Sequence, residues 1–276
     1  ESPIDDIGSN CFFDCSSLTH FDLPQKMTKI STGMFDKCSS LSTISIPHSV
    51  KSILSKAFRN CSDLKEIQFN PTNMSIDPTA FEGCTALETL IIPETEEVCT
   101  HEYNIRSIRC LKHIVVANNI ETIGSKTFCN LDQLERITLP SNLLSLEDYS
   151  FSGCSSLKSI ELPNTIQTIS SHAFEGCSNL AQITIPSTVS EIKECAFSQC
   201  TSLTEIALPE GLSIISTSLF NECTSLETIT LPNTINEIQE SSFHNCTSLV
   251  SISLPSTIKF IPKHAFEGCS SLKMIN

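Results

Sequence analysis

A single pattern recurs along the whole chain with a period of 23 residues and one extra residue near the middle. Its clearest mark is a leucine that holds the same position in twelve successive units, namely Leu18, Leu41, Leu64, Leu87, Leu111, Leu134, Leu157, Leu180, Leu203, Leu226, Leu249 and Leu272. A cysteine precedes this leucine by three residues in ten units, and a phenylalanine precedes it by six residues in eleven. Chance does not place twelve leucines in register, so internal repetition constrains the fold more than any other feature.

Each unit reads L-x-x-I-x-L-P-x-x-I-x-x-I-x-x-x-A-F-x-x-C-x-x, and residues 157–179 are a clean copy. Ile160 and Leu162 alternate with polar residues, which is typical of a short strand with one buried face. Pro163 lacks an amide hydrogen and ends that strand. One unit cannot cover its own apolar face, so the units are expected to stack on one another as a solenoid.

The L-x-x-I-x-L-P and A-F-x-x-C segments resemble the BspA-like class of leucine-rich repeats, and the resemblance runs from Ile4 to Ile275. It implies similarity to surface-exposed, adhesin-like proteins of bacteria and parasitic protists, some of which bind host or extracellular-matrix proteins. The composition, with 15 Cys, 8 Gly and 68 Ser plus Thr, is more similar to the protist branch. The resemblance is specific for the fold and much less specific for function.

The expected fold class is an α/β-type leucine-rich-repeat solenoid of about twelve 23-residue coils. We expect a curved parallel β-sheet on the concave face and short turns or helical segments on the convex face. Residues 1–276 are expected to form one such solenoid, cut within a repeat at both ends and therefore part of a longer chain. Irregular units are expected around residues 70–76 and 93–108, where the repeat pattern is broken.

Fifteen cysteines cannot all pair, and ten of them are one repeat position copied ten times. Equivalent side chains of stacked coils point the same way, whereas a disulfide needs its two Cβ atoms to converge. Packed, reduced thiols are therefore expected at the repeat position. Cys11 and Cys195 are also expected in the core. Cys99, Cys110 and Cys129 lie around the irregular units and are the best candidates for a bridge.

The charge of the chain limits its partners. Lys plus Arg is 17 and Asp plus Glu is 31, which gives a net charge of −14. Nucleic acids and anionic membrane surfaces require a basic patch, so both are disfavoured as partners. No apolar run approaches the roughly 18 residues that span a bilayer, and no membrane insertion is expected in this segment.

The sequence offers no catalytic constellation. It contains no G-x-S-x-G, P-loop or G-x-G-x-x-G motif, and the repeat register brings no Ser, His and Asp together. The acidic insert at residues 94–103 lacks the ligand spacing of a metal site. Three N-x-[ST] sequons, at Asn60, Asn73 and Asn245, are no more than chance gives. We therefore expect a protein that is not an enzyme and has no cofactor or metal.

A partner-binding site is expected where the outward strand positions change character. These positions carry mostly small polar residues, but Ile91 and Val115 are apolar in adjacent coils, with His113 and Arg136 beside them. Exposed apolar groups with a polar rim often mark interaction sites. Two alternatives stay open, since the acidic insert could cover these residues or they could simply be exposed.

Three hypotheses about function follow. The first is a cell-surface or secreted, adhesin-like module that binds a host or matrix protein. The second is an intracellular, cytoplasmic scaffold or regulator of an enzyme such as a phosphatase, which abundant unpaired thiols favour because reducing compartments keep cysteine reduced. The third is self-association through uncapped sheet edges, which leaves the oligomeric state open.

Overall fold

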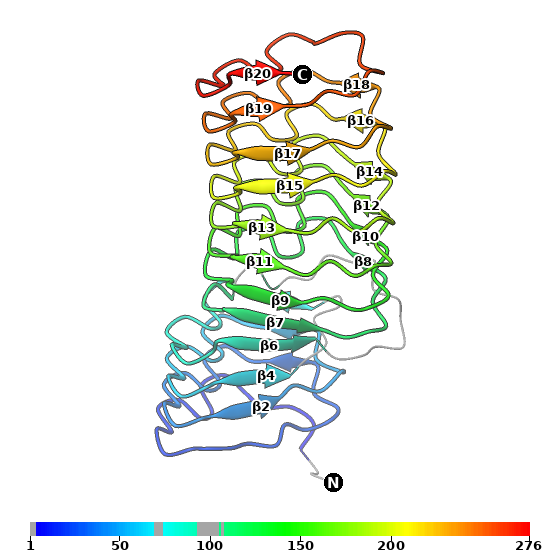
Figure 1. Cartoon of the computed structure of the whole chain (residues 1–276). Coiled ribbons are helices and arrows are strands. Elements are labelled where there is room, and N and C mark those ends of the chain that lie inside the picture. The colour runs from blue at the N-terminus through cyan, green and yellow to red at the C-terminus, as the bar shows by residue number, and fades with distance from the viewer. Residues whose placement is uncertain (1–3, 69–73, 93–104, 106–107) are drawn as a thin grey trace. The chain divides into compact units, whose positions relative to one another are not determined.

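The computed structural model describes residues 4–68, 74–92, 105 and 108–276. They divide into two compact units, one ending at Ala117 and the other running from Asn118 to Asn276. Within each unit the chain winds in successive coils, and each coil lays its strands beside those of the coil before it (Figure 1). The strand pairings among the described residues are all parallel, as the stacking of equivalent segments requires.

From the coil of Leu41 onward, each coil contributes a front strand that begins two residues after the repeat leucine. In the first unit these are β2 (Thr43–Ser45), β4 (Glu66–Gln68), β6 (Thr89–Ile92) and β7 (His113–Val116). In the second they are β9 (Arg136–Thr138), β11 (Ser159–Ile160), β13 (Gln182–Ile183), β15 (Glu205–Ala207), β17 (Thr228–Thr230), β19 (Ser251–Ile252) and β20 (Met274–Ile275). Partners such as Ser159 and Gln182 differ by 23 residues, so the predicted strand and its register are confirmed.

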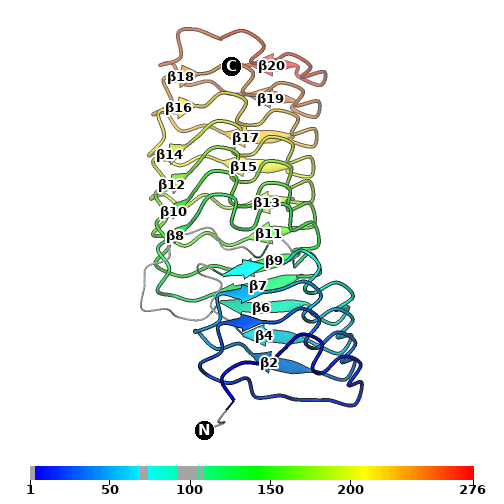
Figure 2. The ribbon, with the colours of Figure 1, turned by 180° about the vertical axis from the view of Figure 1, so that it is seen from behind.

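Nine of the described coils also contribute a side strand in the I-x-x-I segment, which the sequence did not predict (Figure 2). In the first unit these are β1 (Lys29–Ile30), β3 (Ser52–Ile53) and β5 (Ser75–Ile76). In the second they are β8 (Thr122–Ile123), β10 (Ser145–Leu146), β12 (Thr168–Ile169), β14 (Glu191–Ile192), β16 (Ile214–Ile215) and β18 (Glu237–Ile238). All are two residues long, which is too short for an alternating pattern to appear in the sequence.

A column of stacked phenylalanines forms the centre of each unit. In the first unit the rings of Phe12 to Phe81 stack with centroids 5.2–5.4 Å apart, and in the second those of Phe128 to Phe266 stack at 5.2–5.8 Å. Ile105 and Ile108 fill the Phe and Cys positions of the irregular coil, and both are fully buried. The apolar core therefore continues through that coil without an aromatic ring.

The convex segments are turns, and no helix occurs in the described part of the chain. His172 (φ 58°) and Gly176 (φ 71°) show why, because two left-handed residues four apart interrupt any helical run. Helical segments, the other expectation for this face, are therefore not confirmed. About ten turns of roughly 23 residues are supported rather than twelve coils. The first and last repeat leucines belong to incomplete coils, and one irregular coil lies largely outside the described residues.

Asparagine and glycine are paired across neighbouring coils at several of these turns. The side-chain oxygen of Asn130 lies 2.4 Å from the point where a Cβ on Gly153 would be, and Asn245 stands 2.0 Å from that point on Gly268. Both glycines have positive φ, 75° and 77°. Glycine is therefore required at these positions for two reasons. The positive φ is unfavourable for other residues, and the asparagine of the preceding coil fills the space that a side chain would need.

The repeat cysteine has a specific bonding partner. Its thiol donates a hydrogen bond to the carbonyl of the phenylalanine 26 residues earlier, as Cys177 does to Phe151 at 3.2 Å and Cys200 does to Phe174 at 3.3 Å. That carbonyl also accepts the amide of the cysteine in its own coil, at 3.1 Å for Phe174 and Cys177. Both lone pairs of a buried carbonyl are thus satisfied, which a purely apolar residue could not achieve.

All fourteen described cysteines are reduced thiols, as expected for the repeat position. Cys110 and Cys129, two candidates for a bridge, are reduced as well, while Cys99 lies outside the described residues. Cys195 is partly buried, but Cys11 is exposed, so its placement in the core was wrong. Cys11 lies in the first described coil.

Hydroxyl groups join the coils along two further columns. One column directly follows the repeat cysteine, where the hydroxyl in most coils donates to the carbonyl 23 residues earlier, as Thr201 does to Ser178 at 3.2 Å. The other precedes the side strand, where Thr165 donates to Leu143 at 2.7 Å and Thr188 donates to Ile166 at 2.7 Å. Much of the Ser and Thr content therefore supports the stack itself.

Two buried serines, Ser150 and Ser242, lack such a bond, because neither hydroxyl has a hydrogen-bond partner among the described residues. Ser242 occupies the repeat position that is Ala173 and Ala196 in other coils, it is fully buried, and its hydroxyl has no hydrogen-bond partner among the described residues. We expect Ser242→Ala to raise the free energy of unfolding by about 1 kcal/mol, because a buried unsatisfied hydroxyl is removed. Ser31→Ala should lower it by about as much, since the buried Ser31 hydroxyl donates to the Ile7 carbonyl at 2.7 Å. Denaturant unfolding of both variants measures this, and a loss of stability in Ser242→Ala contradicts it.

Candidate functional site

The predicted apolar pair lies on two paired front strands of the first unit. Ile91 on β6 is the register partner of Val115 on β7, and Thr89 is the partner of His113. Ile91, Val115 and His113 are all half-buried, whereas Leu90 and Ile114 between them point into the core. Three of the four predicted residues are therefore brought together on one face.

The surroundings of this pair are polar. In the same outward column, Ser45 and Gln68 precede Ile91, and the three are in register across β2, β4 and β6. Lys112 and Glu88 form an ion pair of 2.5 Å next to His113. Ile91 and Val115 thus interrupt a column of polar side chains with two apolar ones, as the sequence predicted. Both side chains are only partly accessible.

The fourth predicted residue is in the other unit. Arg136 begins β9 and is exposed, and Thr138 at the end of that strand is exposed too. Its place beside Val115 stays a prediction. The acidic insert that was an alternative cover for the apolar pair, residues 94–103, lies outside the described residues.

A shallow hollow of about 360 Å³ lies on the front face of the second unit. Ala207 on β15 is among the residues that line it, and its register partner on β17 is Thr230. Glu205 and Thr228 form another outward register pair of these strands. Ala207 carries only a methyl group where Thr184 and Thr230 stand in the neighbouring coils, and this single alanine was the sequence signal that could have indicated the hollow.

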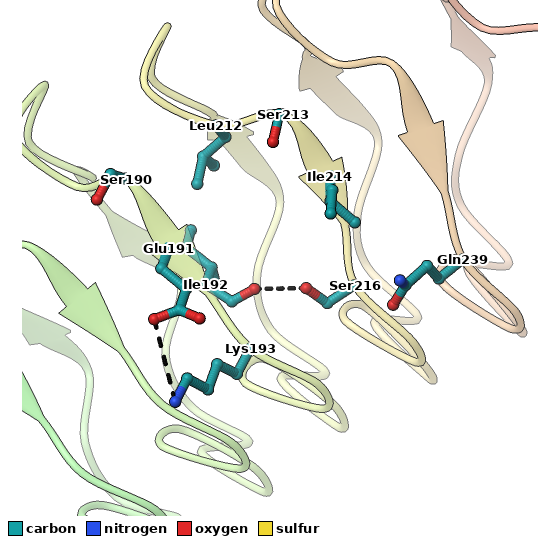
Figure 3. A pocket seen from close by; sticks show the side chains of 9 residues that line it. All are labelled: Ser190, Glu191, Ile192, Lys193, Leu212, Ser213, Ile214, Ser216 and Gln239. Carbon is teal, nitrogen blue, oxygen red and sulfur yellow. Dashed lines mark hydrogen bonds and ion pairs between the residues drawn. The ribbon is translucent and has the colours of Figure 1, made fainter.

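A second hollow of about 430 Å³ opens on the side strands of the same unit, and sequence reasoning missed it because those strands were not predicted. It is lined by Ser190, Glu191, Ile192, Lys193, Leu212, Ser213, Ile214, Ser216 and Gln239. Figure 3 shows the Glu191 and Lys193 side chains on one side of this groove, with Ile214 and Gln239 on the other. We name it the side groove.

The buried thiols are unsuited to chemistry at neutral pH. Burial raises the pKa of Cys177 and of Cys223 from 9.0 to about 12. Burial, followed by the nearby Cys15, raises that of Cys38 to about 11. Cysteine acts as a nucleophile or a metal ligand only in its thiolate form. These thiols stay protonated at neutral pH and are therefore inert.

Neither a metal centre nor a membrane span emerges from the residues that the structure describes. Among them, no three His, Cys, Asp or Glu side chains are grouped so that they could hold a metal ion. In the same part of the chain, no helix has the length and apolar character needed to cross a bilayer.

The repeat, the parallel front and side strands and the cysteine column together define a leucine-rich-repeat solenoid. The model of the BspA type leucine rich repeat region matches residues 1–107, 101–205 and 167–276, and this chain belongs to that family. A search of curated proteins finds no significant match.

Solved structures share this fold. A leucine-rich repeat protein from Bacteroides ovatus is 26% identical, with 92% of this chain and 80% of that chain covered and a TM-score of 0.54. The leucine rich repeat protein of T. pallidum is 22% identical, with 75% of this chain and 78% of that chain covered and a TM-score of 0.50. The family is consistent with a repeat module that binds protein.

Proposed function

We propose that this chain is a non-enzymatic, protein-binding repeat module displayed at the cell surface or secreted, where it recognises a host or extracellular-matrix protein in the manner of an adhesin. The observation that carries the proposal is the apolar step at Ile91 and Val115 in an otherwise polar front column. A rigid parallel sheet holds both side chains at fixed spacing, so a partner can bury them at little entropic cost.

In this proposal His113 and Arg136 form part of the polar rim. Interfaces combine a desolvated apolar centre with a surrounding ring of polar and charged groups, and Arg is enriched among residues that dominate binding. Family membership supports the adhesin-like role, because the resemblance implies proteins of that kind. The inert thiols favour a role in binding over a role in catalysis.

The test is binding to an immobilised extracellular-matrix protein preparation. The double variant Ile91→Ser/Val115→Ser should bind about tenfold or more weakly, which is the usual loss when an apolar centre is removed. Leu144→Ser is the matched control, because Leu144 is a partly exposed apolar residue of the other unit, and its binding should be unchanged. Equal binding by the double variant contradicts the role of the front column.

A second candidate function is an intracellular scaffold or regulator of an enzyme, and the reduced state of all fourteen described cysteines favours it. Antibody labelling of intact cells of the source organism separates the two. Labelling of intact cells supports the surface module, whereas labelling only after permeabilisation supports the scaffold.

A further inference from the structure

The side strands of the second unit are hydrogen-bonded in two groups, β8–β10–β12–β14 and β16–β18. No backbone hydrogen bond joins β14 to β16 among the residues described there. In the preceding coil the Lys193 amide donates to the Ile169 carbonyl at 2.9 Å, but the corresponding bond at β16 comes from the Ser216 hydroxyl, which donates to Ile192 at 2.5 Å. The side groove opens at this break in the ladder (Figure 3).

An exposed isoleucine forms one wall of the groove. Ile214 holds the outward position of β16 and keeps 36% of its surface accessible, whereas the equivalent residue is Ser or Thr in β8, β10 and β12. Leu212 and Ile192 also line the groove and are buried. A large β-branched side chain at this outward position therefore presents apolar surface that its own coil does not use.

Two carboxylates flank this isoleucine. Glu237 is the register partner of Ile214 on β18, and Glu191 holds the same outward position on β14. Both are exposed. The two carboxylates therefore lie on the coils before and after the isoleucine.

The wider charge around the groove is acidic. Glu194 and Glu240 lie shortly after the two strands and are exposed. Lys193 is the one basic side chain in the described lining, and its ion pair with Glu191 is long, at 4.0 Å. Exposed pairs of this kind contribute little, so a cationic partner can displace Lys193 from Glu191. Glu237 accepts a hydrogen bond from the Gln239 amide at 2.9 Å and keeps further acceptor sites for a cation.

We infer that the side groove docks a basic, amphipathic helix of a partner protein, with one apolar side chain against Ile214 and a basic side chain on each of Glu191 and Glu237. The exposed carboxylates select a basic partner, and an amphipathic helix presents basic and apolar side chains together on one face at positions i, i+4 and i+7. This surface is on the side strands and is independent of the front column proposed above.

The probe is a fluorescent, alanine-rich helical peptide with Lys at positions i and i+7 and Leu at i+4. It should bind the intact chain in a salt-sensitive manner, because steering by exposed charges is screened by salt. The double variant Glu191→Lys/Glu237→Lys should bind it about tenfold or more weakly and should bind the peptide with Glu at i and i+7 better than the native chain does. Adding Ile214→Ser should weaken the binding of the Lys peptide to the native chain and also the binding of the Glu peptide to the double variant.

A control keeps the change in net charge constant. Glu161→Lys/Glu205→Lys places the same charges on the front strands of the same unit, and it should leave peptide binding within about twofold of the native value. A thermal unfolding transition like that of the native chain shows that each variant is folded. The inference is overturned if the native chain does not bind the Lys peptide, or if both double variants lose it equally. If Ile91→Ser/Val115→Ser still binds the Lys peptide, the side groove binds independently of the front column.

Discussion

Unfolding is expected to become steeply easier above about pH 9, because the buried thiols cannot ionise until the chain unfolds. The pKa of Cys177 and of Cys223 is raised by burial from 9.0 to about 12. An acid whose pKa is raised in the folded state adds stability that is fully present below its unfolded pKa. That stability is lost as the pH rises from about 9 to about 12, since the unfolded chain then releases protons that the folded chain holds.

The expected size of this effect is large. Each thiol of this kind lowers the free energy of unfolding by about 1.4 kcal/mol per pH unit within that window, so Cys177 and Cys223 together lower it by about 3 kcal/mol per unit. Burial also raises the pKa of Cys154 and Cys200, which adds to the slope. The total free energy of unfolding of most single domains is only about 5–15 kcal/mol. Ionisation of the buried cysteines can therefore cause a loss of stability of about the same size.

Denaturant unfolding at a series of pH values from 8 to about 11 measures the slope. Cys177→Ala should reduce the slope by about one proton relative to the native chain, because one buried thiol then no longer ionises on unfolding. Lysine and tyrosine titrate in the same range in both proteins, so the difference between the two slopes carries the result. An unchanged slope in Cys177→Ala would contradict ionisation of the buried column as the cause.

The second large effect is expected from the aromatic column. Phe174 is fully buried between Phe151 and Phe197, with ring centroids at 5.4 and 5.5 Å. Phe174→Ala removes both contacts and leaves a cavity that rigid neighbouring coils cannot fill, so we expect a loss of about 3–5 kcal/mol in the free energy of unfolding. Because a solenoid coil contacts only its neighbours, the loss should be concentrated in the coils around it.

Phe260→Ala is the matched control, since the Phe260 side chain is 74% exposed in the same unit. Its effect on stability should stay within about 0.5 kcal/mol. Hydrogen exchange of the two variants adds the spatial readout, with faster exchange expected around residues 151–197 only in Phe174→Ala. A uniform loss of protection throughout the unit would show that its coils unfold as one body.

The repeat register could be predicted because it depends on residue type alone. A leucine, a cysteine and a phenylalanine at constant spacing place Ser159 beside Gln182 whatever the turns do. The reduced thiols followed from the same argument, since side chains at equivalent positions point in parallel. The apolar pair of Ile91 and Val115 could be located for this reason too.

The side strands and their groove could not be predicted in the same way. A strand of two residues, such as β16, carries no alternation, so its existence depends on hydrogen bonds that the neighbouring coil supplies. The side groove depends on one missing set of those bonds, between β14 and β16. The identities of Ile214 and Ser216 do not reveal whether the hydrogen-bonded ladder of side strands is continuous or interrupted at this coil.

The contacts that join one coil to the next have a consequence for how such a chain can change its length. Thiol, hydroxyl and aromatic partners lie one repeat away, so excision or duplication of one 23-residue unit recreates contacts of the same kinds at the new junction. The Asn–Gly turns are the exception, since Gly268 must still follow an asparagine such as Asn245 or another glycine. Unequal recombination between repeats can therefore alter the reach of this protein in whole steps, with these turns deciding which junctions are tolerated.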